Sequence, residues 1–296
     1  MLAGQKATSR ALRRQRLLAL RKVVKSVEQR GVVPQPEFFA MAIEMAAVVA
    51  MIDEAMEAQP LPGRSSRVVD LIARLHDKSN WSGPTRKALA CTKGCSFCCE
   101  LYVSASAPQV FAIADFLRER HANDLSAAVQ RIEEADVHTR GRDAYSRAEH
   151  RAFCPFLVNS LCSIYPVRPA VCRACCSLSV AACEARADVI PTPEYTEPVR
   201  RAYDTALWAA LHGRGLVNQC YELAHAVVVA LKEADAEVRW YAGEDVFAGV
   251  AVDQPGNVTR SGADLQALFW DSLWNVAHGD APPGGPFVGK FPPWCL

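Results

Sequence analysis

The stretch CTKGCSFCCE, residues 91–100, places four cysteines within nine positions. Six more follow between Cys154 and Cys183, so ten of the twelve cysteines in this chain of 296 residues lie in one central zone. Clustered thiols constrain a fold strongly, because they form disulfides in secreted proteins and bind metals or carry out redox chemistry inside cells. The compartment therefore decides which chemistry to expect.

The N-terminal segment indicates an intracellular chain. Residues 1–30 contain nine Lys or Arg and one acid, Glu28, and their short leucine-rich part is followed at once by Arg21 and Lys22. This pattern lacks the apolar core of a secretion signal. The longest apolar run, residues 45–52, is far shorter than the roughly 20 residues that span a bilayer. We expect a cytoplasmic protein with no membrane span.

The balance of charge limits the classes of partner. A formal net charge of +1 argues against a generally basic nucleic-acid binder, so nucleic acid is not an expected partner. Only the N-terminal segment is strongly basic. Leu17, Leu20, Val24 and Val27 can lie along one side of a helix there. We therefore favour an ordinary amphipathic helix over a nucleic-acid or membrane role for this segment.

Helical periodicity dominates on both sides of the cysteine zone. Before it, apolar spacing predicts helices over about residues 8–30, 37–58 and 65–78, separated by proline-rich breaks. After it, one apolar stripe predicts a buried helix in which Cys220 is a small core residue; its members are Cys220, Leu223, Ala224, Val227, Val228 and Leu231. A second helical pattern follows Gly262 and consists of Leu265, Leu268, Phe269 and Leu273.

The expected fold is a mainly α protein with a central irregular cysteine-rich metal-binding region, since convincing β patterns are few apart from short pieces such as residues 246–252. Composition divides the chain into three regions. These are an N-terminal helical region over 1–80, a cysteine-cluster metal-binding domain over 81–185 and a C-terminal helical region over 186–296.

The spacer between the two cysteine groups predicts a helical hairpin. Ser106 can cap one helix and Asp124 can open another, each followed by apolar residues at helical spacing. A helix that runs out and a second that runs back would return the chain after Cys99 to the neighbourhood of Cys154. The two groups of thiols can therefore meet.

The clustered thiols point to zinc or an iron–sulfur cluster. Thiolates held close together repel one another unless a cation or an iron–sulfur core offsets their charge, and Arg168 and Arg173 are available nearby. If residues 91–99 were helical, the four thiols would share a stripe about 100° wide, which an ordinary core could also explain. Only His150 lies close to a cysteine group, which favours an all-sulfur ligand set.

Two known families share parts of this pattern. Cys91, Cys95 and Cys98, with Phe97 before the last cysteine, resemble the radical SAM signature. That resemblance implies three thiolates on a [4Fe-4S] cluster within a partial barrel of alternating strands and helices. The flanking sequence instead shows helical patterns and no glycine-rich segment that could seat the cofactor, so we keep this as an alternative.

The second cysteine group extends the comparison to another family. CPFLVNSLCSIYPVRPAVCR, residues 154–173, together with the first group, resembles the CxxCxxCC cysteine-cluster proteins, often called YkgJ-like and described as zinc- or iron-chelating. The resemblance covers roughly 91–176. The first gap here holds three residues where the family pattern has two, which makes Cys91 the least certain member. Cys175, Cys176 and Cys183 lie beyond the matching pattern.

These observations define the expected site and function. We expect zinc or iron, including a [4Fe-4S] cluster, on one set of thiolates, in a metal-binding protein whose helical flanks can engage a protein partner. The expected ligands are Cys91, Cys95, Cys98, Cys99, Cys154, Cys162 and Cys172. A cluster-dependent enzyme is the alternative, either with radical SAM-type chemistry or with methyl transfer, because flagellin lysine N-methylases carry a similar cysteine-rich motif.

Overall fold

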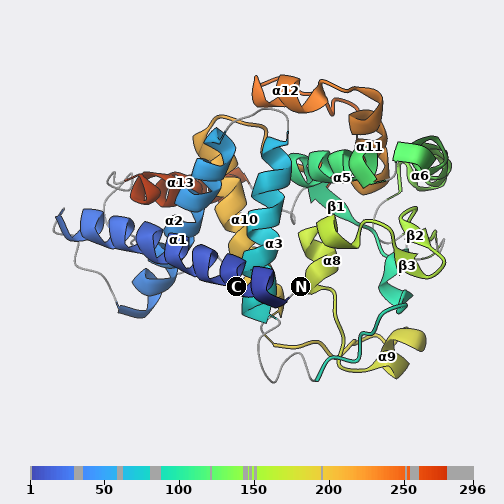
Figure 1. The fold of residues 1–296 in the computed structure, drawn as a ribbon, viewed down its shortest axis with the longest axis horizontal. Coiled ribbons are helices and arrows are strands. Elements are labelled where there is room, and N and C mark those ends of the chain that lie inside the picture. The colour runs from blue at the N-terminus through green and yellow to red at the C-terminus, as the bar shows by residue number, and fades with distance from the viewer. Residues whose placement is uncertain are drawn as a thin grey trace. The chain divides into compact units, whose positions relative to one another are not determined.

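The structure, a computed structural model, is mainly helical as predicted (Figure 1). The residues that it describes are 2–29, 36–58, 63–80, 88–120, 122–142, 146, 149, 152–194, 196–250, 252–253 and 260–278. By their contacts the segments form two compact units, the first made of 1–58, 201–218 and 257–296 and the second of 59–200 and 219–256. The three regions drawn from composition stay a prediction. No helix in the described part of the chain is long and apolar enough to cross a membrane.

The first unit is built from α1 (Leu2–Gln29), α2 (Pro36–Glu57), α13 (Arg260–Ala277) and most of α10 (Thr196–Gly213). The helices predicted over 8–30, 37–58 and after Gly262 are thereby confirmed. Helix α2 packs against both α1 and α13, because apolar residues surround much of its circumference. Helix α1 contributes the buried side chains of Leu12 and Val23 to this core.

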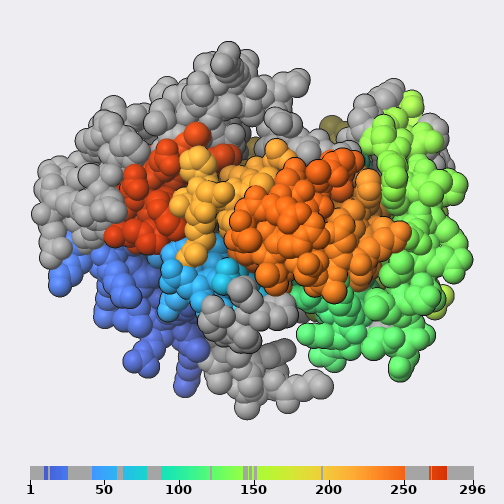
Figure 2. Space-filling model, turned by 90° about the horizontal axis from the view of Figure 1, so that it is seen from above, coloured from blue at the N-terminus to red at the C-terminus, as the bar shows by residue number. Residues whose placement is uncertain are grey.

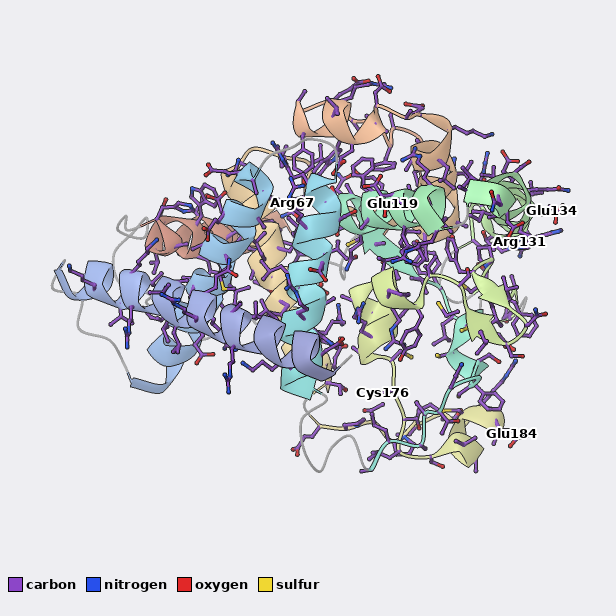
Figure 3. The ribbon with its side chains drawn as sticks, viewed as in Figure 1. Arg67, Glu119, Arg131, Glu134, Cys176 and Glu184 are labelled. Atoms are coloured by element: carbon purple, nitrogen blue, oxygen red, sulfur yellow. The ribbon has the colours of Figure 1, made fainter. Side chains whose placement is uncertain are left out.

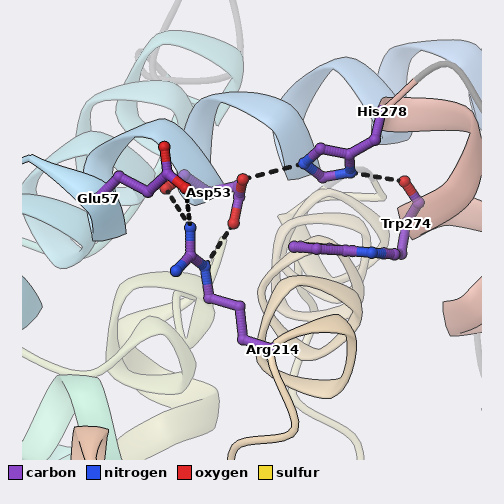
Figure 4. Close-up of polar contacts among 5 residues, drawn as sticks. All are labelled: Asp53, Glu57, Arg214, Trp274 and His278. Carbon is purple, nitrogen blue, oxygen red and sulfur yellow. Dashed lines mark hydrogen bonds and ion pairs between the residues drawn. The ribbon is translucent and has the colours of Figure 1, made fainter.

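Two close contacts fix α13 in this unit. Gly213, at the end of α10, leaves no space for a side chain, because a Cβ atom there would lie 2.0 Å from Cδ2 of Trp274. One turn further on, His278 Nε2 lies 2.9 Å from Oδ2 of Asp53 on α2, and its Nδ1 lies 2.8 Å from the carbonyl oxygen of Trp274 (Figure 4). Arg214 also donates to Asp53 and pairs with Glu57.

The second unit surrounds α5 (Ala107–Arg120), which packs against α3 (Arg64–Asn80) and α11 (Leu223–Lys232). Helix α6 (Leu125–Thr139) covers α11, and Figure 2 shows their surfaces side by side, in green and orange. Helix α12 (Ala236–Tyr241) supplies the buried Glu237, whose carboxylate accepts the Gly63 and Ser65 backbone N–H groups at 2.9 and 2.7 Å. This carboxylate thus caps the N-terminus of α3.

A short antiparallel sheet in this unit corrects one prediction. Its strands are β1 (Ser104–Ser106), β4 (Cys220–Glu222) and β5 (Val252–Asp253), in the order β1-β4-β5. Cys220 therefore lies in a strand, half-buried and paired with Ser106 and Asp253, and α11 begins only at Leu223. The prediction that Cys220 belongs to this helix was therefore wrong. The β piece expected over 246–252 was largely wrong too, since 246–249 are turn residues.

The spacer forms the predicted pair of helices, α5 and α6, joined by a short 3-10 turn, Ala122–Asp124. Its caps differ from expectation. The buried Ser106 hydroxyl has no hydrogen-bond partner, and Gln109 instead accepts the Ser106 backbone N–H at 3.1 Å, which is the reciprocal half of a capping box. Asp124 occupies the N-cap position of α6 without a side-chain hydrogen bond.

Candidate metal centre

The first cysteine segment is a turn followed by a 3-10 helix. Cys95 donates its backbone N–H to the Thr92 carbonyl at 3.0 Å, closing a four-residue turn. Gly94 occupies the third position of that turn with φ of +91°, a conformation that a side chain would strain. Cys98 and Cys99 then lie in η1 (Phe97–Glu100). The four thiols are therefore not on an α-helical stripe.

The second segment is an irregular strap in which Cys162, Cys172 and Cys183 lie in short elements, whereas Cys154, Cys175 and Cys176 lie between elements. Cys162 ends a two-residue hairpin of β2 (Leu157–Val158) and β3 (Leu161–Cys162), whose turn residues Asn159 and Ser160 have φ of 50° and 61°, as type I′ turns require. After η3 (Tyr165–Val167), Cys172 lies in the five-residue helix α8 (Ala170–Ala174), which starts behind Pro169. Cys183 lies in α9 (Val180–Glu184).

The two segments meet, as the helical hairpin predicted. Cys154 donates its backbone N–H to the Cys99 carbonyl at 2.7 Å. A second link joins Ala90 N–H to the Ser177 carbonyl at 2.9 Å, and Ser177 N–H in turn lies 3.3 Å from the Cys91 sulfur. Near α9, Arg186 pairs with Glu100 of η1. Residues more than 50 positions apart are thus held side by side.

Three sulfur atoms are in hydrogen-bonding contact across this junction. Hydrogen bonds from the Cys175 and Cys99 thiols lower the pKa of the Cys98 thiol far below its ordinary value. The same bonds raise the pKa of Cys99 and of Cys175, because each thiol keeps its proton to donate it. Cys98 is therefore the thiol of the three that ionises most readily, and its two neighbours come one from each segment.

The remaining thiols surround this contact. Burial raises the pKa of Cys91, Cys162 and Cys172, and neighbouring cysteines raise it further, among them Cys98 in each case. Ionising one sulfur thus opposes the ionisation of the next. No three His, Cys, Asp or Glu side chains of the described ranges are gathered closely enough to hold a metal ion as they stand. A metal would have to draw the sulfur atoms together.

The two arginines of the strap have different roles. Arg173 is buried and donates to Asp77 at 3.2 Å and to the Pro166 carbonyl, so it ties the strap to α3. Arg168 lies over the ring of Tyr165, with its guanidinium carbon 4.1 Å from the ring centroid. Its charge acts to lower the pKa of Cys98, Cys162, Cys172 and Cys176. Arg168 therefore favours thiolates in the cluster.

Three further cysteines adjoin the predicted set. Cys175 interacts with Cys98, which raises the pKa of Cys175, and its sequence position beyond the family pattern did not indicate this. Cys176 is buried on the segment between α8 and α9, with its thiol 3.3 Å from the Ala174 carbonyl (Figure 3). Cys183 acts electrostatically on Cys91. His150, the one histidine considered as a neighbour of the cluster, lies outside the described residues.

The chemistry of these donors fits a thiophilic metal. Soft sulfur ligands select zinc, copper(I) or iron–sulfur clusters over magnesium and calcium. The donor set therefore favours these metals.

The chain was compared with known proteins and with protein families. No curated protein and no solved structure gives a significant match to the chain. Residues 90–197, however, match the model of the CxxCxxCC family, which is described as a putative zinc- or iron-chelating domain.

Proposed function

We propose that the chain is a cytoplasmic metal-binding protein that holds zinc or an iron–sulfur cluster between its two cysteine segments. The ligands would come from Cys91, Cys95, Cys98, Cys99, Cys154, Cys162 and Cys172, and Cys175 joins them on the strength of its contact with Cys98. The observation that carries the proposal is the meeting of the two segments, where Cys154 N–H donates to the Cys99 carbonyl at 2.7 Å and Ser177 N–H lies 3.3 Å from the Cys91 sulfur.

Charge explains why such an arrangement suits a cation. With the thiols protonated, the cluster is held by weak S–H hydrogen bonds. Burial first and the charge of neighbouring thiolates second raise the pKa values of Cys162 and Cys172, so both oppose the ionisation of all the thiols together. A divalent ion or an iron–sulfur core removes this conflict, since it neutralises several thiolates at once and displaces their protons. Metal affinity should therefore fall as the pH falls.

The identity of the metal is tested by anaerobic purification followed by elemental analysis and visible spectroscopy. A [4Fe-4S] cluster gives a brown protein with iron and sulfide in equal amounts, whereas a structural zinc site gives a colourless protein with stoichiometric zinc. Protein that binds neither zinc nor iron after reconstitution under reducing conditions would contradict the proposal. Both outcomes with metal support the binding function and decide its chemistry.

A pair of substitutions tests whether both segments contribute to the same site. Cys95→Ser and Cys172→Ser should each lower metal content to a similar extent, because each removes a soft ligand from one side of the junction. Cys220→Ser is the matched control, since Cys220 lies in β4 and belongs to neither segment. Retention of the full metal content by a fragment that ends before residue 150 would show that the first segment binds metal alone.

The enzyme alternatives are less well supported. A radical SAM barrel needs parallel strands that alternate with helices, but both sheets in the described part of the chain are antiparallel and have two or three short strands. Methyl transfer to lysine would need a methyl donor bound beside the cluster. Incubating metal-loaded protein with S-adenosylmethionine and a lysine-containing peptide tests that alternative, and methylated peptide would favour it.

The helical parts outside the CxxCxxCC domain are proposed to engage a protein partner. In this proposal the metal stabilises the site, and the partner contacts residues outside 90–197. None of the described cysteines from Cys91 to Cys220 forms a disulfide, which suits a reducing cytoplasm. A pull-down with the whole chain, before and after metal removal, would test whether partner binding depends on the metal.

A further inference from the structure

The exposed side of α1 carries a stripe of positively charged side chains. Helical geometry places Arg10, Arg14, Arg21 and Lys25 within an arc about 60° wide, and each of these residues is exposed. The buried Leu12 and Val23 lie on roughly the opposite side, where α1 packs against α2 and α13. The packing of α1 in the first unit therefore leaves the charged stripe free.

The sequence concentrates charge on this helix to an unusual degree. Residues 1–30 hold nine of the 33 basic side chains and one of the 32 acids, so the remainder of the chain has 24 basic and 31 acidic side chains. No acid precedes Glu28. A near-neutral protein thus consists of one strongly basic helix and an acidic remainder, and such asymmetry is typical of a surface that binds polyanions.

Two leucines distinguish this stripe from a purely electrostatic one. Leu17 and Leu18 occupy the turn between Arg14 and Arg21, and they are 45% and 48% exposed. Together with Arg10, Arg14 and Arg21 they line one hollow of the surface. Exposing two neighbouring leucine side chains to water is unfavourable, and the phosphate groups of a nucleic acid would not bury them.

We propose that this face of α1 docks onto an anionic phospholipid surface, with its arginines and Lys25 on the lipid phosphates and Leu17 and Leu18 in the acyl boundary. Charge complementarity selects an anionic surface, and the two exposed leucines select a bilayer over a nucleic acid. In this proposal the helix lies on the membrane and does not cross it, because its many charged side chains rule out a membrane span. This role is independent of the metal site.

The test measures sedimentation of the whole chain with vesicles. Vesicles with about one third phosphatidylserine should bind the protein, pure phosphatidylcholine vesicles should not, and added salt should weaken binding. The double variant Arg14→Gln, Arg21→Gln should bind about 25-fold more weakly, from about fivefold for each cation lost. The double variant Arg14→Lys, Arg21→Lys keeps the charge and should bind as the natural sequence does.

Two further variants test whether the leucines contribute and whether the loss of an arginine elsewhere on the protein has any effect. Leu17→Gln with Leu18→Gln should weaken vesicle binding about tenfold, because two inserted leucines are lost. Arg131→Gln is the matched control, since Arg131 is an exposed arginine on α6 (Figure 3) and should leave binding unchanged. Circular dichroism of each variant confirms that α1 remains folded.

Three results would overturn the proposal. One is equal binding to vesicles with and without phosphatidylserine. A second is binding by the Arg14→Gln, Arg21→Gln variant that matches the Arg131→Gln control. The third is tighter binding to a short RNA duplex than to anionic vesicles, with the leucine variant unchanged on both, which would assign the stripe to nucleic acid.

Discussion

The contact between His278 and Asp53 makes the stability of the first unit dependent on pH (Figure 4). Both ring nitrogens of His278 face acceptors, the Asp53 carboxylate and the Trp274 carbonyl, so these contacts favour the doubly protonated cation. The hydrogen bond to Asp53 raises the pKa of His278 above 6.5, although burial opposes it. Burial raises the pKa of Asp53, but hydrogen bonds from His278 and Arg214 outweigh it and leave that pKa below 3.8.

The sign of the effect follows from these two shifts. A raised pKa of His278 means that its contribution is fully present below pH 6.5 and is lost as the pH rises through the raised value. A lowered pKa of Asp53 means that its contribution is present above pH 3.8 and is lost as the pH falls through the lowered value. The contact therefore stabilises the fold most between these limits.

The free energy that the His278–Asp53 contact contributes depends on how far the two side chains are exposed to water. A hydrogen bond between charged groups contributes about 1.5 to 3 kcal/mol when it is protected from water. The side chains of His278 and Asp53 are 32% and 12% exposed, so screening by solvent reduces this to about 1 kcal/mol. His278→Gln should lower the free energy of unfolding by about that amount near pH 6 and by much less near pH 9.

Urea unfolding of the natural sequence and of His278→Gln at both pH values measures this difference. His138→Gln is the control, because His138 is an exposed histidine on α6 in the other unit. The reasoning would be refuted by a stability difference that stays constant between the two pH values or that grows at alkaline pH.

Three further substitutions test packing, ligation and capping. Gly213→Ala should destabilise the fold by about 2 kcal/mol in thermal unfolding, because its Cβ would collide with the Trp274 ring; an unchanged melting temperature would contradict the packing. Cys98→Ser should lose metal in elemental analysis, whereas Cys220→Ala should keep it and cost about 1 kcal/mol; equal metal loss would place Cys220 in the site. Glu237→Ala should cost about 2 kcal/mol in urea unfolding, since two N–H groups of α3 lose their acceptor, and no loss would mean that water replaces it.

The sequence could predict those parts of the fold that depend on local periodicity. Apolar spacing located α1, α2, α3 and α13, and it located the α5–α6 hairpin that returns the chain to the cysteines. Their apolar residues recur at helical spacing, and this pattern is visible in a window of a dozen residues. The meeting of Cys99 and Cys154 followed from that hairpin alone.

The errors involve contacts between distant residues. Cys220 continues the apolar spacing of α11 backwards, so nothing local separates it from the helix. Its strand exists because Ser106 and Asp253 pair with it from far away in the sequence. The sequence did not decide whether Cys175 is a ligand for a similar reason. Its interaction with Cys98 depends on the path of the chain around α8 and not on the spacing of the cysteines in the sequence.

Cys99 and Cys154, which are joined by a backbone hydrogen bond in the folded protein, are synthesised at different times. These residues are 55 positions apart, so a ribosome that adds about 5 to 20 residues per second needs about 3 to 11 seconds to make the second after the first. During that interval the four thiols of residues 91–99 leave the ribosome without their partners. Whatever captures thiols first in the cell, whether a metal carrier or an oxidant, acts on a half-made site. Pulse alkylation of ribosome-bound chains stalled before and after residue 183 should show this vulnerability closing as the strap emerges.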